Sequence, residues 1–258
     1  MDAMSIVEAL VLGVVEGVTE FLPISSTAHL MFTSELLSLA QSAFVKSFEV
    51  AIQLGAILAV VVLYWRSFLN IQTVKYVAVA FVPTVLVGAL LYPFIKSSLI
   101  GNVPVALAAL AAGGLFLVIF ERWRPVSPKV KPSDTQLSYR NAFWVGLSQS
   151  VAVVPGVSRS AATIIGGLLL GLDRRTIVEF SFLLAVPTMA AATGYDLYKN
   201  AGAFAQSDFT VLSIGFVTSF VVALMAIKWL LSFVRTHDFT AFGVYRIAAA
   251  ALFFFILL

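Results

Sequence analysis

Two acidic residues, Glu16 and Glu20, lie in an apolar stretch that carries no lysine or arginine between Asp2 and Lys46. If this stretch is helical, the spacing of four places both carboxylates on one face. Two like charges in an apolar site cannot both ionise cheaply. The pair would therefore share a proton, bind a divalent cation, or pair with Arg159 further along the chain. A carboxylate-bound Mg²⁺ or Ca²⁺ commonly bridges to a substrate phosphate.

Hydroxyl residues and a histidine follow these acids. Pro23 and the run Ser25-Ser26-Thr27 are expected to end the first helix, and serine or threonine is a favoured N-cap for the next. His29 follows within one turn, and its closeness to Ser26 favours acid–base work or activation of a nucleophile. Helix capping for the hydroxyls and a core position for the histidine are the alternatives.

A second polar tract, residues 155–160, contains an isolated arginine, Arg159. Gly156 allows the backbone to approach a ligand closely. Ser158 and Ser160 flank Arg159 at the predicted start of a helix, where free N–H groups favour an anion. Arginine is suited to bidentate phosphate contact, so the tract predicts a phosphate cradle. The alternative is that Arg159 serves only as the counter-ion of an acid.

The composition indicates an integral membrane protein. Of the 258 residues, 60% are hydrophobic and 11% are charged, and the mean hydropathy is +1.01. A soluble domain of this length does not need so much apolar surface. The first apolar segment contains three glutamates and lacks a basic start, so it is not expected to be a cleaved signal peptide. The absence of cysteine excludes disulfides and thiolate metal sites. The net charge is only +3, and the placement of the basic residues matters more than its size. No nucleic-acid partner is expected.

Six apolar segments are long enough to cross a bilayer, which takes about 20 residues. They cover residues 44–64, 74–95, 103–121, 176–197, 209–233 and 241–258. The pairs 3–24/28–40 and 139–154/160–172 each contain a short member and break at a polar tract. Each pair predicts a re-entrant helix–loop–helix hairpin, because irregular backbone at that depth is tolerated where it lines a cavity. The predicted fold is therefore an all-α polytopic membrane protein.

Basic residues predict the orientation, because they are enriched in cytoplasmic loops. Most of them lie in four loops, at Arg66, Lys75, Arg122, Arg124, Lys129, Lys131, Arg140, Arg174, Arg175 and Arg235. The other side, which includes both termini, carries only Lys46, Lys96 and Lys199 among the loops. Both termini are therefore expected to lie outside the cytoplasm.

The two halves of the chain resemble each other weakly, because residues 13–26 parallel residues 146–158. With the orientation above, the two hairpins enter from opposite sides, which is the pattern of an inverted-topology repeat. We expect a single membrane domain over 1–258, with repeat one at about 1–121, a cytoplasmic loop at 122–138 and repeat two at about 139–258.

Four further polar residues lie in or near the long segments. Glu49 and Gln53 are also four residues apart, and they would either line the cavity or pair with Lys46. Glu179 would likewise either line the cavity or pair with a basic residue. Arg246, inside the last segment, is expected to snorkel or to pair structurally.

The sequence resembles the bacterial undecaprenyl pyrophosphate phosphatase family of the bacitracin-resistance type over essentially its whole length. The matching segments are 16–27 with His29, 155–160 with Thr163, 48–55 and 179–187. One departure is Ala28, where the family frequently has glycine. The resemblance implies an enzyme of the bacterial cytoplasmic membrane that removes the terminal phosphate of undecaprenyl diphosphate, and whose site opens to the outer face.

The resemblance also implies site residues and a divalent cation, Mg²⁺ or Ca²⁺. The family's acidic motif corresponds to Glu16 and Glu20, and its essential serine, histidine and arginine correspond to Ser26, His29 and Arg159. We expect substrate contacts from Ser25, Thr27, Gly156, Ser158, Ser160, Thr163 and Gln53. The expected partners are the bilayer and a polyprenyl diphosphate lipid, and a homodimer is one option for the assembly.

Two alternatives stay open at the level of sequence. Ser26 would be the nucleophile with His29 or Glu20 as its base, or a water molecule would attack while Ser26 only positions the substrate. From the architecture alone, a secondary transporter or lipid flippase is the competing function, since such proteins also use broken helices with acids near the midplane.

Overall fold

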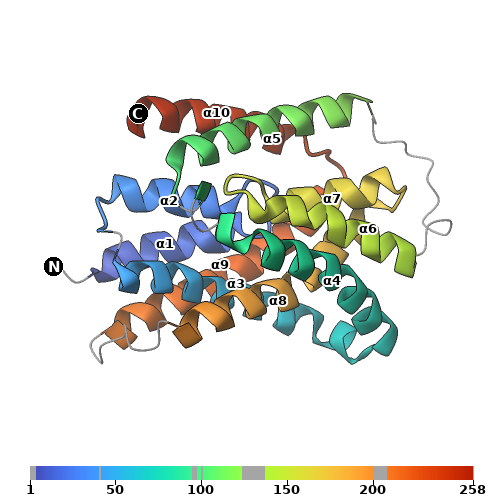
Figure 1. The fold of residues 1–258 in the computed structure, drawn as a ribbon, viewed down its shortest axis with the longest axis horizontal. Coiled ribbons are helices and arrows are strands. Elements are labelled where there is room, and N and C mark those ends of the chain that lie inside the picture. The colour runs from blue at the N-terminus through green and yellow to red at the C-terminus, as the bar shows by residue number, and fades with distance from the viewer. Residues whose placement is uncertain are drawn as a thin grey trace.

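A computed structural model describes residues 4–40, 42–94, 98–99, 101–123, 137–199 and 208–257, and the regular structure of these residues is helical (Figure 1). The α-helices of this part are α1 (Ile6–Thr19), α2 (Ser26–Leu36), α3 (Ala43–Leu69), α4 (Ile71–Phe94), α5 (Val103–Trp123), α6 (Tyr139–Gln149), α7 (Arg159–Leu169), α8 (Arg174–Lys199), α9 (Asp208–Phe233) and α10 (Thr240–Leu257). A short 3₁₀ helix, η2 (Ser150–Val153), follows α6. Four basic residues used for the orientation, Lys96, Arg124, Lys129 and Lys131, lie outside the described residues.

Six helices, α3, α4, α5, α8, α9 and α10, are long and apolar enough to cross a membrane. They coincide with the six predicted segments to within a few residues at each end, which confirms the all-helical polytopic class. Their outer faces carry large apolar side chains, such as Leu90, Trp229 and Phe255, that are half exposed or more. Such a surface is stable against lipid and would be unfavourable in water.

Each polar tract lies between the two members of a pair of short helices, α1 and α2 for the first tract and α6 and α7 for the second. Helices α1 and α2 lie in the half of the molecule that also holds both marked chain ends, whereas α6 and α7 lie in the opposite half (Figure 1). A helix of 14 residues, the length of α1, spans about 21 Å, which is less than the hydrocarbon core of a bilayer. The connection within each pair is irregular, and the two connections meet between the pairs.

Each of the leading short helices packs closely on a long one. Helix α1 lies against α9, and α6 lies against α4. A Cβ atom on Gly17 would come within 2.7 Å of the carbonyl oxygen of Ser219, and one on Gly146 within 1.8 Å of that of Ala80. Because only glycine permits these approaches, the glycines set the depth at which α1 and α6 sit.

The long helices complete the framework in two groups. Helices α3 and α8 contact each other and border the site, while α5 and α10 form a separate layer on one side (Figure 1). At the start of α8, Arg174 makes a two-pronged ion pair with Glu121, at 2.6 and 2.9 Å. Glu121 also accepts a hydrogen bond from the backbone N–H of Phe239. This contact joins α5, α8 and the start of α10.

Candidate active site

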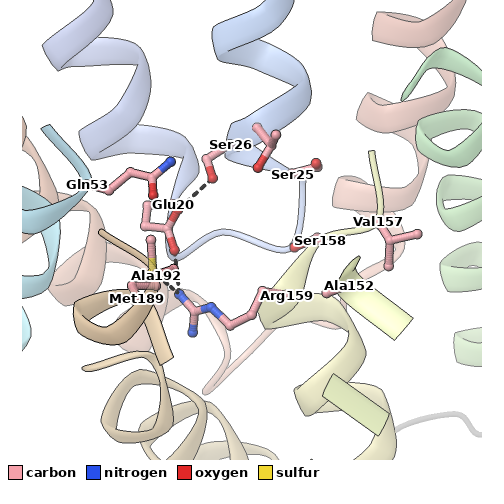
Figure 2. A pocket seen from close by; sticks show the side chains of 11 residues that line it. Glu20, Ser25, Ser26, Gln53, Ala152, Val157, Ser158, Arg159, Met189 and Ala192 are labelled. Atoms are coloured by element: carbon pink, nitrogen blue, oxygen red, sulfur yellow. Dashed lines mark hydrogen bonds and ion pairs between the residues drawn. The ribbon is translucent and has the colours of Figure 1, made fainter. Parts of the chain in front are cut away.

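A cavity of about 240 Å³ lies where the two irregular connections meet (Figure 2). The first residues of α2 and of α7 both border it, so two helix N-termini meet at the same cavity. Its lining consists of Glu20, Ser25, Ser26, Thr27, Gln53, Ala152, Val157, Ser158, Arg159, Met189 and Ala192. The structure thus brings together residues from both polar tracts, as the sequence predicts.

Glu20 is the central side chain of this cavity (Figure 2). Its backbone keeps helical angles, and its N–H donates to the carbonyl of Glu16 at 2.9 Å, so the two acids share one helix face. Oε2 accepts a hydrogen bond of 2.5 Å from Oγ of Ser26. Oε1 lies 2.6 Å from Nη2 of Arg159 in an ion pair. One carboxylate therefore links the hydroxyl of the first tract to the cation of the second.

Arg159 is held from several directions. It is the first residue of α7, whose N-cap is Ser158. Nη1 donates to the carbonyl of Ser181 at 2.9 Å, and the guanidinium carbon lies 5.8 Å from the ring centroid of Phe21. Its Nε is buried and has no hydrogen-bond partner within the part of the chain that the structure describes. The guanidinium is thus fixed at the cavity wall and keeps an unused donor.

Ser25 has an unusual backbone conformation with φ +71°. This left-handed region is costly for a residue that is not glycine, and such strain tends to occur at functional sites. Ser25 is the N-cap of α2, but its hydroxyl makes no capping bond and has no partner among the described residues. The capping role that the sequence suggested is therefore absent for the Ser25 hydroxyl, and the residue lines the cavity with Thr27 and Gln53.

His29 lies beside the site but not in its wall. Nδ1 is 2.8 Å from the carbonyl oxygen of Ser25, which can only accept, so this nitrogen carries the proton. Nε2 is 2.8 Å from the hydroxyl of Tyr245, and the two rings stack with centroids 5.6 Å apart. Both ring nitrogens therefore have hydrogen-bond partners other than Ser26. Of the two bases that the sequence left open, the structure places Glu20 in contact with the hydroxyl.

Three predicted substrate-binding residues in or just after the second tract are not among the residues that line the cavity. Ser160 donates to the carbonyl of Leu22 at 2.8 Å, which ties the second connection to the first. Thr163 is buried 2.6 Å from the hydroxyl of Ser181. Gly156 has φ +91°, and a Cβ atom there would lie 2.3 Å from the carbonyl oxygen of Ala106. Its close approach is to helix α5, whereas the sequence suggested an approach to a ligand.

Glu16 is the buried acid without a partner. Its side chain is fully buried, and neither carboxylate oxygen has a hydrogen-bond partner among the described residues. A buried carboxylate in this state is costly unless a proton or a cation joins it. Carboxylate oxygens are ligands of the type that Mg²⁺ and Ca²⁺ prefer, although Glu20 lines the cavity and Glu16 does not. The described residues contain no cluster of three acidic or histidine side chains, so the remaining ligands would come from substrate phosphate or water.

The four polar residues of the long helices have different surroundings from one another. Glu49 does not line the cavity and accepts a 2.5 Å hydrogen bond from Ser34, whereas Gln53 does line it. Glu179 pairs with Arg175 on the surface. Arg246 neither snorkels nor forms an ion pair among the described residues. It is buried, and its hydrogen bonds to described residues all go to backbone carbonyl groups.

Sequence reasoning missed several contributors to the site. Met189 and Ala192 line the cavity from the middle of α8, and Tyr245 reaches His29 from α10. Met189 also lies 3.8 Å from Arg159 through its sulfur atom. Apolar residues in long apolar helices carry no local signal that separates a cavity wall from lipid contact. Only the packing of α8 and α10 against the two connections identifies them.

The fold and the site together define a polytopic helical membrane protein with a polar cavity between two broken helix pairs. The pattern of the family described as bacitracin resistance protein BacA matches residues 9–252. The chain belongs to this family, as its two polar tracts predicted.

Individual relatives match over almost the whole chain, and each is named undecaprenyl-diphosphatase. The one from Sulfurihydrogenibium sp. (strain YO3AOP1) is 51% identical over 97% of this chain and 99% of its own length. The one from Aquifex aeolicus (strain VF5) is 50% identical over 93% and 94%. The one from Thermus thermophilus is 46% identical over 100% of both. A transporter is not favoured, because these relatives are named as phosphatases.

Proposed function

We propose that this chain hydrolyses undecaprenyl diphosphate to undecaprenyl phosphate and inorganic phosphate in the bacterial inner membrane. This reaction returns the carrier lipid to cell-wall synthesis and accounts for the resistance to bacitracin that names the family. The observation that carries the proposal is the contact series Ser26–Glu20–Arg159 beside two helix N-termini in one cavity. A nucleophile, a base and an anion-binding group are thereby within one site.

The geometry supports attack by Ser26. Its Oγ would bond to the terminal phosphorus while Glu20, 2.5 Å away, accepts the hydroxyl proton. The bond from that phosphorus to the bridging oxygen breaks, and undecaprenyl phosphate leaves with the bonding electrons. Water then cleaves the phosphoserine and releases inorganic phosphate. Direct attack by a water molecule, with Glu20 as base, is the competing route.

Arg159 and the helix N-termini would stabilise the transferring phosphoryl group. Phosphoryl transfer spreads negative charge over the equatorial oxygens, so catalysis depends mainly on positioned positive groups. Nε of Arg159 and the hydroxyl of Ser25 are buried and have no partner among the described residues, and we propose them as donors to phosphate oxygens. Thr27, Gln53 and Ser158 would complete the contacts, since they also line the cavity.

We further propose that Glu16 and Glu20 hold a divalent cation, Mg²⁺ or Ca²⁺. The support is the buried, unpartnered carboxylate of Glu16 one helical turn before Glu20. When bound, the cation would neutralise charge on the diphosphate. Glu16 would anchor it, and Glu20 would share its charge between the cation, Ser26 and Arg159.

The arrangement of the helices supports the proposed inverted repeat with two re-entrant hairpins. Helix α1 packs on α9 as α6 packs on α4, while α3 contacts α8 and α5 contacts α10. These contacts are those expected if α1–α5 and α6–α10 are equivalent units. The proposed orientation puts both termini and the mouth of the site outside the cytoplasm. A homodimer stays a prediction, which light scattering in detergent would check.

The test of function is phosphate release from undecaprenyl diphosphate by the purified protein in detergent. It is run with Mg²⁺, with Ca²⁺, with a chelator, and with Arg159→Ala. Release that requires metal and disappears in the variant supports the enzyme and the site. Binding of the lipid without any release by the wild-type protein would contradict the proposal.

A further inference from the structure

Arg246 is a buried cation near the middle of α10. Its residue is 1% exposed, and it is the largest fully buried side chain of the described chain. The ion pairs found between described residues do not include it. A charged group inside an apolar helix bundle is costly, and such residues usually have a functional reason to be there.

The guanidinium donates hydrogen bonds to four backbone carbonyl groups of the described residues instead of pairing with a carboxylate. Nη1 donates to the carbonyl of Pro23 at 3.2 Å, and Nη2 donates to that of Gly156 at 2.9 Å. Nε and Nη2 donate at 3.2 Å to the carbonyls of Leu110 and Ala109 in α5. An arginine has five N–H donors in a planar fork, so this side chain uses most of its capacity on main-chain oxygens.

Two of these acceptors belong to the irregular connections of the site. Pro23 lies between Glu20 and Ser26, and Gly156 lies three residues before Arg159. Carbonyl groups beyond the end of a helix lack the usual intrahelical partner, and a buried one needs a donor from elsewhere. A single side chain therefore satisfies one carbonyl on each side of the cavity and fixes both to α5.

Helix α5 is shaped to receive this guanidinium. A Cβ atom on Gly113 would lie 2.1 Å from Nη2 and 2.8 Å from Cζ of Arg246. Any residue other than glycine at position 113 would displace the charged group. The space left by the missing side chain of Gly113 on α5 is therefore occupied by the guanidinium of Arg246 on α10.

We propose that Arg246 is a positioning residue that sets the separation of the two connections, and thereby aligns Ser26 and Glu20 with Arg159. The inference rests on the proposed function for its effect on rate, but its structural part does not. Lysine cannot replace it. The four carbonyl groups are bound by three different nitrogens of the planar guanidinium, and a single ammonium nitrogen cannot reach all of them. Arg246 itself does not line the cavity.

The kinetic test compares Arg246→Met, Arg246→Lys and Gly113→Ala with the wild type. Arg174→Gln is the matched control, because it also removes a buried arginine contact but touches neither connection. We expect kcat to fall about 10²-fold in Arg246→Met, which is the scale of a misplaced reacting group. KM should change less, Arg246→Lys should not restore kcat, and Gly113→Ala should lower kcat although the arginine is retained.

A second measurement is independent of activity. The chain has no cysteine, so cysteines at Thr27 and Val157 can carry spin labels on the two sides of the cavity without a background. We expect the distance distribution between the labels to broaden in Arg246→Met and in Gly113→Ala, and to stay narrow in Arg174→Gln. If Arg246→Met does not fold, Gly113→Ala carries both tests.

The outcomes separate this inference from the proposed function. A wild-type protein without phosphate release would contradict the proposed function. Broadened distance distributions between the labels in the variants would still support the positioning role of Arg246. Unchanged label distances in the folded variants would overturn the inference whatever the rates are. A kcat equal to that of the wild type in Arg246→Met would overturn it as well.

Discussion

The hydroxyl of Ser26 donates a 2.5 Å hydrogen bond to Glu20, across a helix break that separates the two residues by six positions. The other oxygen of the same carboxylate is held by Arg159 at 2.6 Å. Glu20 is therefore oriented by one partner while it faces the other. This is the arrangement of nucleophile, base and orienting group that activated hydroxyls require.

Ser26→Ala is expected to abolish phosphate release, because the substitution removes the proposed nucleophile. Thermal unfolding should change little, since the side chain makes a single hydrogen bond to the described residues. Steady-state release of phosphate from undecaprenyl diphosphate measures the first effect. Residual turnover well above background would instead identify water as the attacking group.

Glu20→Gln is expected to reduce kcat by about 10²–10⁴-fold, because an amide cannot accept the proton of Ser26. The exposed acid Glu35 on α2 provides the control, and Glu35→Gln should retain the wild-type kcat. Both rates are measured at saturating substrate. Comparable rates for the two variants would remove Glu20 from the role of base.

Glu16→Gln is expected to raise the concentration of Mg²⁺ or Ca²⁺ needed for half-maximal rate. The reason is that the two carboxylate oxygens of Glu16 are buried and have no hydrogen-bond partner among the described residues. Titration of the metal into chelator-treated protein measures this, and Glu49→Gln serves as a comparison because that acid bonds to Ser34. An unaltered metal requirement in Glu16→Gln would argue that its carboxyl group carries a proton instead.

Tyr245→Phe is expected to lower kcat only modestly, by the equivalent of about 1 kcal/mol for one hydrogen bond. The hydroxyl contacts His29, whose ring nitrogens face away from Ser26. Comparison with Ser26→Ala in the same assay provides the scale. If the phenylalanine variant lost as much activity as that one, His29 would have to be returned to the chemical step.

Arg174→Gln is expected to lower the free energy of unfolding by about 3 kcal/mol, because it leaves the buried carboxylate of Glu121 without its cation. The kcat should be retained, since neither residue lines the cavity. Denaturation in detergent, followed by helix content, measures the stability. Equal stability of variant and wild type would show that the pair contributes nothing net.

Much of the fold was predictable from the sequence for a simple reason. Burial in lipid requires long apolar helices, and a charge or a proline inside such a helix stands out against them. The six long helices and the breaks near Pro23 and Gly156 follow from that local signal. The same signal identified Glu20 and Arg159, because ionisable groups are rare in apolar segments.

The role of each residue in the site depends on where its side chain points, and the local sequence does not specify that direction. Gly156 lies three residues before Arg159 and Thr163 lies four residues after it, yet they pack against α5 and α8 while Arg159 faces the cavity. His29 lies near Ser26 in the chain, but its ring turns to Tyr245 on α10.

Apolar length and isolated charge are properties of the chain, so they specify the membrane class, the helix breaks and the two tracts that carry the chemistry. Which acid contacts Ser26, and why Arg246 can be buried, depends instead on contacts made in three dimensions. Those contacts join residues from 6 to 223 positions apart. They exist only because α10, α5 and the two connections are packed together, and the close approach of backbones at glycines makes that packing possible.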